Sequence, residues 1–140
     1  MKTYNKAVVW GTWDFCHEGH LNLISRAYKL AEEVVVGVST DDMVFIRKGK
    51  FPTFNYEHRS RLIGLLKFVS AVYPQSEGFS KKDLIMKVKP DVVFVGHDYK
   101  KSKEYEELKK LGVKVVYLPR TPKISSTIIN ENINNNNNSQ

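Results

Sequence analysis

Two histidines lie three residues apart in the segment GTWDFCHEGH, residues 11–20. On a helical turn the rings of His17 and His20 point the same way, so both imidazoles can act on one ligand. They can donate hydrogen bonds to phosphate oxygens and stabilise the charge that grows when an α-phosphorus is attacked, without a covalent intermediate. Two simpler interpretations stay open: a pair that only caps and solvates a helix start, and a metal site, for which only Asp14 is close in sequence.

Glycines in the same segment favour a ligand close to the backbone. Gly11 permits a tight turn against a ligand, and Gly19 leaves room for a phosphate between the two histidines. Backbone N–H groups at the start of the following helix can hold phosphate oxygens with help from the helix dipole. The segment is therefore typical of a phosphate site, with the two simpler interpretations still open.

A second polar segment, RTPKISST, follows the last apolar run and spans residues 120–127. Hydroxyl groups of Ser125, Ser126 and Thr127 at a helix start suit the β- and γ-phosphates of a nucleotide. Arg120 can supply a planar cation with several donors. A plain helix N-cap is the simpler interpretation of these hydroxyls.

Apolar runs rich in β-branched residues predict the strands that would position these groups. The runs at 7–10, 34–38, 92–95 and 113–118 read as strands buried on both faces, and 71–73 as a further short strand. Their carboxyl ends are where ligands bind in a parallel sheet, so function is expected just after residues 10, 39, 95 and 118.

Segments with helical spacing separate these runs. One helix is predicted between the first two strands, and others over 81–88 and 104–111. A further helix is predicted to start at Tyr56, with an apolar stripe of Leu62, Leu65, Leu66 and Val69. Alternating strands and helices predict the α/β class: a Rossmann-like single domain with a central parallel sheet of about five strands flanked by helices.

The size and composition of the chain fit one domain that buries its own core, since 41% of the 140 residues are hydrophobic and 26% charged. We assign it to residues 1–130 and predict a disordered asparagine-rich tail over 131–140. The single cysteine, Cys16, excludes an internal disulfide, so a reducing compartment, the cytoplasm, is expected. No apolar run is long enough to span a membrane, and a net charge of +7 favours an anionic partner.

The pattern Gly-Thr-Trp-Asp-x-x-His-x-Gly-His, placed after the first predicted strand, resembles the signature of the cytidylyltransferase family, within the larger HxGH nucleotidyltransferase superfamily. Residues 120–127 resemble the family's second signature, Arg-Thr followed by Ile-Ser-Thr-Thr. They differ from it at Lys123, where glycine is usual, and at Ser126, where threonine is usual. Two signatures in the correct order greatly reduce the chance of coincidence. The resemblance spans about residues 4–130.

The resemblance implies three sets of site residues. The catalytic set is His17, His20, Lys50 and Arg120. The nucleotide-binding set is Gly11, Thr12, Trp13, His17, Gly19, His20, Lys50, Arg59, Asp98, Arg120, Thr121, Ile124, Ser125, Ser126 and Thr127. The substrate-binding set is Asp14, Arg47 and Lys81.

Some of these residues carry a more specific expectation. Arg47 and Lys50 are expected on a basic loop, residues 47–50, between the second strand and the second helix. Arg59 is expected either to contact nucleotide phosphates or to brace the site. Asp14 is expected to orient its loop rather than act as a base, because the attacking phosphate is already ionised at neutral pH.

The implied reaction is transfer of CMP from CTP to a small alcohol phosphate, with release of pyrophosphate and with glycerol 3-phosphate as the first-choice acceptor. The resemblance also implies Mg²⁺ with the CTP and a homodimer, and no protein-bound metal is assigned. An adenylyltransferase acting on a sugar phosphate or FMN is the alternative. A noncatalytic nucleotide- or nucleic-acid-binding module is a third interpretation. A nucleic-acid partner is not expected, because the basic residues are scattered over several loops. Membrane insertion is not expected either, because no apolar run is long enough.

Overall fold

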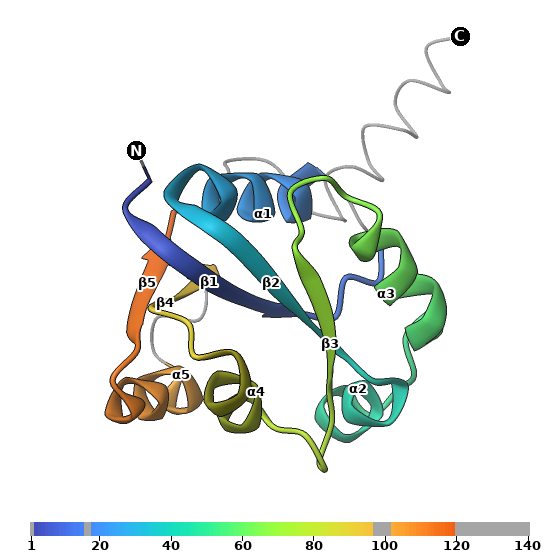
Figure 1. Cartoon of the computed structure of the whole chain (residues 1–140). Helices are drawn as coiled ribbons and strands as arrows, with labels where there is room; N and C mark the ends of the chain where they lie inside the picture. Colours follow the sequence, from blue (N-terminus) through green and yellow to red (C-terminus); the bar gives the residue numbers. More distant parts are fainter. Residues whose placement is uncertain (1, 16–17, 97–101, 120–140) are drawn as a thin grey trace, which may run out of the picture.

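The computed structural model describes residues 2–15, 18–96 and 102–119, which form helices around one parallel sheet (Figure 1). Five strands pair in the order β3-β2-β1-β4-β5, which confirms the predicted fold class. The strands are β1 Tyr4–Gly11, β2 Ala31–Ser39, β3 Ala71–Gln75, β4 Val92–Gly96 and β5 Lys114–Leu118. The helices are α1 Glu18–Leu30, α2 Asp41–Lys48, α3 Tyr56–Gly64, α4 Lys81–Val88, α5 Lys103–Leu108 and the 3₁₀ turn η2 Lys109–Leu111. None of the helices in the described ranges is long and apolar enough to cross a membrane.

Helices cover both faces of the sheet (Figure 1). Two layers of apolar side chains hold them there. α1 and α3 cover one face, where Ile24 and Ile63 join a core with residues of β1, β2 and β4. α4 and α5 cover the other face, where Leu84 and Leu108 join a second core that includes Val8. Because successive side chains of a strand point to opposite faces, neighbouring apolar residues of one run enter both layers. This explains why the runs show no alternation with polar residues.

Helix α2 differs from the prediction, which placed residues 47–50 on a loop. The hydroxyl of Thr40 caps its start by accepting a hydrogen bond from the N–H of Met43. Gly49 ends it at a φ of +76°, in the left-handed region that favours glycine. Arg47 therefore lies in the last turn of a helix. Only Val44 of this helix is buried, so the sequence carries no apolar stripe to reveal it.

The predicted apolar stripe of the helix from Tyr56 is wrong at two positions. α3 ends at Gly64, and Leu62 and Leu65 are 44% and 73% exposed. The buried face instead carries Arg59 and Ile63, which are four residues apart. A buried arginine thus sets the orientation of this helix, which hydrophobicity alone would have turned the other way.

The carboxyl ends of the strands line up along one edge of the sheet. Gly11 ends β1 beside Val38 of β2, and Gly96 ends β4 beside Leu118 of β5. The chain builds the sheet outward from β1 in both directions, so the switch point of the strand order lies between β1 and β4. Ligands of such folds bind in the crevice at this point. The fold therefore directs attention to the turn after β1.

Candidate active site

The turn after β1 is fixed by Trp13, which is 3% exposed. Its indole N–H donates to the Gly37 carbonyl of β2 over 3.1 Å, while its backbone adopts a φ of +57°. Gly11 permits this packing, because a Cβ at that position would lie 2.8 Å from the indole. The indole also meets the His20 ring nearly at right angles, with 5.2 Å between the ring centroids. Trp13 therefore orients His20 from within the core.

The Arg59 guanidinium joins the segments around this turn, and Arg59 is 1% exposed. It donates to the carbonyl oxygens of Thr12, Ser39 and Phe54, each over 2.7 Å. It also donates to Oδ1 of Asp41 over 2.7 Å. One cation thereby holds the turn after β1, the end of β2, the start of α2 and the loop before α3. These contacts are those of a brace, and a contact between Arg59 and nucleotide phosphates stays a prediction.

Asp14 ties the same turn to the loop before α3. Its Oδ2 accepts a hydrogen bond from the Thr53 N–H at 2.8 Å, and its Oδ1 accepts one from the Phe54 N–H at 2.9 Å. Phe15 packs nearby against Phe54, with 5.5 Å between the ring centroids. Both carboxylate oxygens are thus engaged in holding the backbone, which is the orienting role expected for Asp14.

Arg47 reaches from α2 toward the ends of the central strands. Its Nη2 donates to Oγ of Ser39 over 2.7 Å and to Oγ1 of Thr12 over 3.5 Å. The Ser39 hydroxyl donates in turn to Oε1 of Gln75, the last residue of β3. The arrangement places a predicted substrate ligand, Arg47, beside a predicted nucleotide ligand, Thr12.

Lys81 lies at the start of α4, on the other face of the sheet, and is 4% exposed. Its ammonium group forms an ion pair with Oε1 of Glu104 at 2.8 Å. The centroids of the Trp10 and Tyr105 rings lie 5.8 Å and 5.3 Å from the same nitrogen. Burial lowers the pKa of Lys81, against the opposing effect of the Glu104 carboxylate. Binding of a substrate phosphate by Lys81 stays a prediction.

The structure gathers most of the described site residues at the carboxyl edge of the sheet. Contacts around the turn after β1 connect Gly11, Thr12, Trp13, Asp14, His20, Arg47 and Arg59. Gly19 lies beside His20 in the first turn of α1, and Lys50 is exposed just beyond α2. The other predicted site residues lie outside the described residues: His17, Asp98, Arg120, Thr121, Ile124, Ser125, Ser126 and Thr127. Arg26 of α1 donates to the Pro119 carbonyl over 2.5 Å, immediately before the second signature.

Sequence reasoning missed four polar partners of the site. Ser39 and Asp41 flank Thr40 in a Ser-Thr-Asp-Asp sequence at the end of a predicted strand, which is a helix-start pattern that could have revealed them. Gln75 and Glu104 are brought in by the tertiary fold, since they lie 36 residues from Ser39 and 23 residues from Lys81. No local pattern marks either of them.

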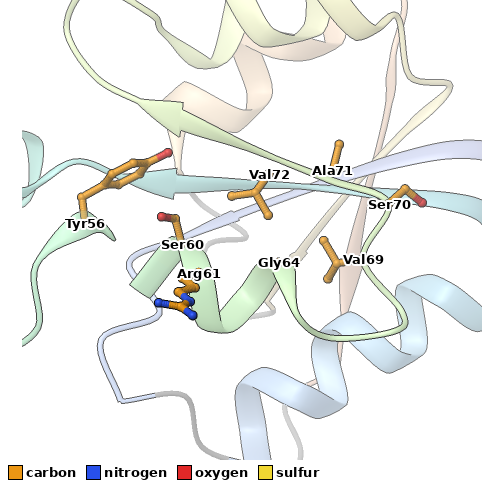
Figure 2. Close-up of a pocket in the computed structure, with 8 residues that line it drawn as sticks. All are labelled: Tyr56, Ser60, Arg61, Gly64, Val69, Ser70, Ala71 and Val72. Atoms are coloured by element: carbon orange, nitrogen blue, oxygen red, sulfur yellow. The ribbon is translucent and has the colours of Figure 1, made fainter. Parts of the chain in front are cut away.

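A separate pocket of about 340 Å³ lies between α3 and β3 (Figure 2). Ala71 and Val72, at the start of β3, form part of its wall, whereas the ligand-binding edge lies at the other end of that strand. Burial raises the pKa of Tyr56, which lines the same pocket. The remaining lining residues are Ser60, Arg61, Gly64, Val69 and Ser70. This pocket is therefore distinct from the crevice at the switch point.

Within the described ranges, no group of three or more His, Cys, Asp or Glu residues lies close enough together to hold a metal ion. Asp14, three residues before His17 in the sequence, uses both carboxylate oxygens for backbone N–H groups.

A parallel sheet in this order, with a histidine- and glycine-bearing turn at its switch point, defines a Rossmann-like nucleotide-binding domain. The chain belongs to the cytidylyltransferase-like family, whose model matches residues 8–132. It is 37% identical over 128 residues to a glycerol-3-phosphate cytidylyltransferase of Bacillus subtilis, covering 91% of this chain and 96% of that one.

Two further comparisons give relatives with other names. An FAD synthase of Thermococcus onnurineus is 37% identical over 113 residues, which cover 78% of this chain and 75% of the relative. A solved structure of a lipopolysaccharide core biosynthesis protein from Thermoplasma volcanium superposes with a TM-score of 0.70 at 29% identity. That likeness covers 84% of this chain and 97% of the other. The chain is thus similar in sequence or fold to proteins with different names.

Replacing Arg59 by lysine tests the brace. A single ammonium group cannot reach the carbonyls of Thr12, Ser39 and Phe54 together with Asp41, so buried acceptors lose their partners. We expect Arg59→Lys to lower the free energy of unfolding by about 3 kcal/mol in urea titrations. The exposed Arg61 of the same helix supplies the control, and Arg61→Lys should change stability by less than about 0.5 kcal/mol. Equal stability of the two variants would contradict the brace.

Proposed function

We propose that this protein is a cytidylyltransferase that transfers CMP from CTP to a small alcohol phosphate, with glycerol 3-phosphate as the first choice, and releases pyrophosphate. The observation that carries the proposal is the position of the histidine segment, which leaves β1 at the switch point of the sheet with His20 oriented by Trp13. The relative from Bacillus subtilis, matched over almost its whole length, supports the choice of acceptor. The same proposal places the enzyme in the cytoplasm, where its single cysteine stays reduced.

In this reaction a phosphate oxygen of the acceptor attacks the α-phosphorus of CTP in line with the departing pyrophosphate. A bond forms between that oxygen and the α-phosphorus while the bond to the β-phosphate oxygen breaks. His17 and His20 donate hydrogen bonds to the α-phosphate region and stabilise the developing charge. Lys50, Arg120 and the hydroxyls of residues 125–127 hold the β- and γ-phosphates.

The acceptor is held from the other side of the crevice. Arg47 and Lys81 supply the positive charge for its phosphate, and Asp14 keeps the turn and the loop before α3 in place. No strong base is needed, because a phosphate monoester is already ionised at neutral pH. Mg²⁺ enters this proposal as part of the triphosphate substrate, where it neutralises charge.

An adenylyltransferase acting on FMN or a sugar phosphate is the second candidate, and the FAD synthase of Thermococcus onnurineus is the observation that favours it. A matrix of four nucleoside triphosphates against glycerol 3-phosphate, choline phosphate, ethanolamine phosphate, a pentitol phosphate, a sugar phosphate and FMN separates the two. We expect pyrophosphate release with CTP and glycerol 3-phosphate, with CDP-glycerol identified by mass spectrometry. Activity with ATP and FMN or a sugar phosphate, and none with CTP, would reverse the order of the candidates.

Replacing His20 by alanine tests the role of the histidine pair. The variant loses a preorganised donor to the α-phosphate, so we expect turnover to fall by about two to four orders of magnitude with the circular dichroism spectrum unchanged. His17→Ala should behave in the same way. His58→Ala is the control, because His58 is exposed in the first turn of α3, where its ring stacks on Phe54. Near-normal turnover in both His17→Ala and His20→Ala would remove the mechanism.

The proposal includes a homodimer formed through α3 and β3. β3 is an edge strand of the described sheet, and α3 packs against it. Leu62 on α3 and Leu65, which follows the last residue of α3, are both exposed. Burying these leucines against a second copy would remove apolar surface from water. Light scattering should therefore give twice the chain mass, and Leu65→Glu should give the monomer. Leu21→Glu, at an exposed leucine of α1, should stay dimeric. A monomeric wild-type protein would contradict this part of the proposal.

A further inference from the structure

Lys81 is held in a fixed position at the start of α4. Ser80 precedes it and closes a capping box, in which its hydroxyl accepts from the Asp83 N–H and the Asp83 carboxylate accepts from the Ser80 N–H. Only 5% of the Lys81 side chain is exposed. Helix capping and burial together leave the ammonium group little freedom to move.

The groups that face this ammonium come from three elements. β1 contributes Trp10, α5 contributes Glu104 and Tyr105, and the guanidinium of Arg47 on α2 acts on it through its charge. The indole N–H of Trp10 is buried and has no hydrogen-bond partner among the described residues. Lys81 therefore has a second cation, Arg47, within electrostatic range, and Glu104 supplies the negative charge. Such a set of donors favours an anion with several acceptor oxygens.

The two side chains of the Lys81–Glu104 ion pair differ in exposure. The Glu104 side chain is 54% exposed, whereas Lys81 is buried. The carboxylate can turn into water at little cost, because water solvates it there, but the ammonium cannot follow. A phosphate monoester carries a charge of about −1.5 to −2 at neutral pH and three acceptor oxygens. It can therefore offer Lys81 more negative charge and more acceptor oxygens than a single carboxylate does.

We propose that Glu104 is a specificity-determining residue, which occupies the Lys81 ammonium in the absence of acceptor and is displaced by the phosphate of the acceptor. The inference rests on the proposed function, since it takes a phosphate monoester as the second substrate. A ligand with a single negative charge only replaces the single charge of the Glu104 carboxylate. Because it brings no additional charge to Lys81, we expect it to bind weakly. The Glu104 carboxylate also raises the pKa of Lys81, against the effect of burial, which lowers it.

Glu104→Gln tests the inference, because glutamine keeps the shape of the side chain and removes its charge. At saturating CTP and pH 7, we expect the KM for glycerol 3-phosphate to fall about fivefold, with kcat and the KM for CTP within about twofold of wild type. The ratio of the variant KM to the wild-type KM should then rise between pH 7 and pH 9. Without the carboxylate the Lys81 pKa is lower, so the ammonium loses its proton earlier as the pH rises. Taking the ratio cancels the ionisation of the acceptor itself.

Glu107→Gln is the matched control, since it removes the same charge from the same helix. Glu107 pairs with Lys110 at 3.0 Å, and both side chains are exposed. The KM values of Glu107→Gln should equal those of wild type. Glu104→Asp keeps the charge, so its KM should retain the wild-type pH dependence. An unchanged or raised KM in Glu104→Gln, or the same shift in Glu107→Gln, would overturn the inference while leaving the reaction intact. Absence of CDP-glycerol with wild-type enzyme would instead overturn the proposed function, and with it this inference.

Discussion

A buried cation holds together the edge of the sheet where the site lies. The Arg59 guanidinium bonds to three backbone carbonyls and one carboxylate, and these belong to four separate segments. Among the described residues, Asp41 alone forms an ion pair with Arg59, and its side chain is partly exposed. Backbone carbonyl dipoles therefore supply much of the solvation of Arg59. The conformations of the turn after β1 and of the loop before α3 therefore depend on each other, because both are bonded to Arg59. A ligand in the crevice meets a surface that is already organised.

Gly37 links the two halves of the proposed site through β2. On one side its carbonyl accepts the indole N–H of Trp13, which in turn orients His20. On the other side the absence of a side chain admits Trp10, whose ring a Cβ would approach to 2.1 Å. Trp10 then lies beside the Lys81 ammonium. The nucleotide half and the acceptor half thus share one residue in the centre of the sheet, which fixes their relative position.

Strands β1, β2 and β4 were predictable because their valine-rich runs are buried on both faces and leave a clear pattern. The edge strands β3 and β5 were predicted as well, but their side chains are mostly half-buried. Helix α2 was missed because it buries only Val44 and has no apolar stripe, although its caps, Thr40 and Gly49, are helix signals present in the sequence. The predicted orientation of α3 was wrong because the helix buries Arg59 and leaves two leucines exposed. Only the tertiary fold shows which groups this arginine binds. The same limit applies to Glu104, whose pairing with Lys81 depends on how α5 packs beside α4. The histidine segment was found because its chemistry lies within ten consecutive residues.

The most direct test of the account is a crystal structure of the protein with CTP bound. The account predicts the triphosphate at the carboxyl edge between β1 and β4, with His17 and His20 within hydrogen-bonding distance of the α-phosphate and Arg59 still buried beneath the turn. CTP bound in the pocket between α3 and β3, or histidine rings turned away from the phosphates, would contradict it.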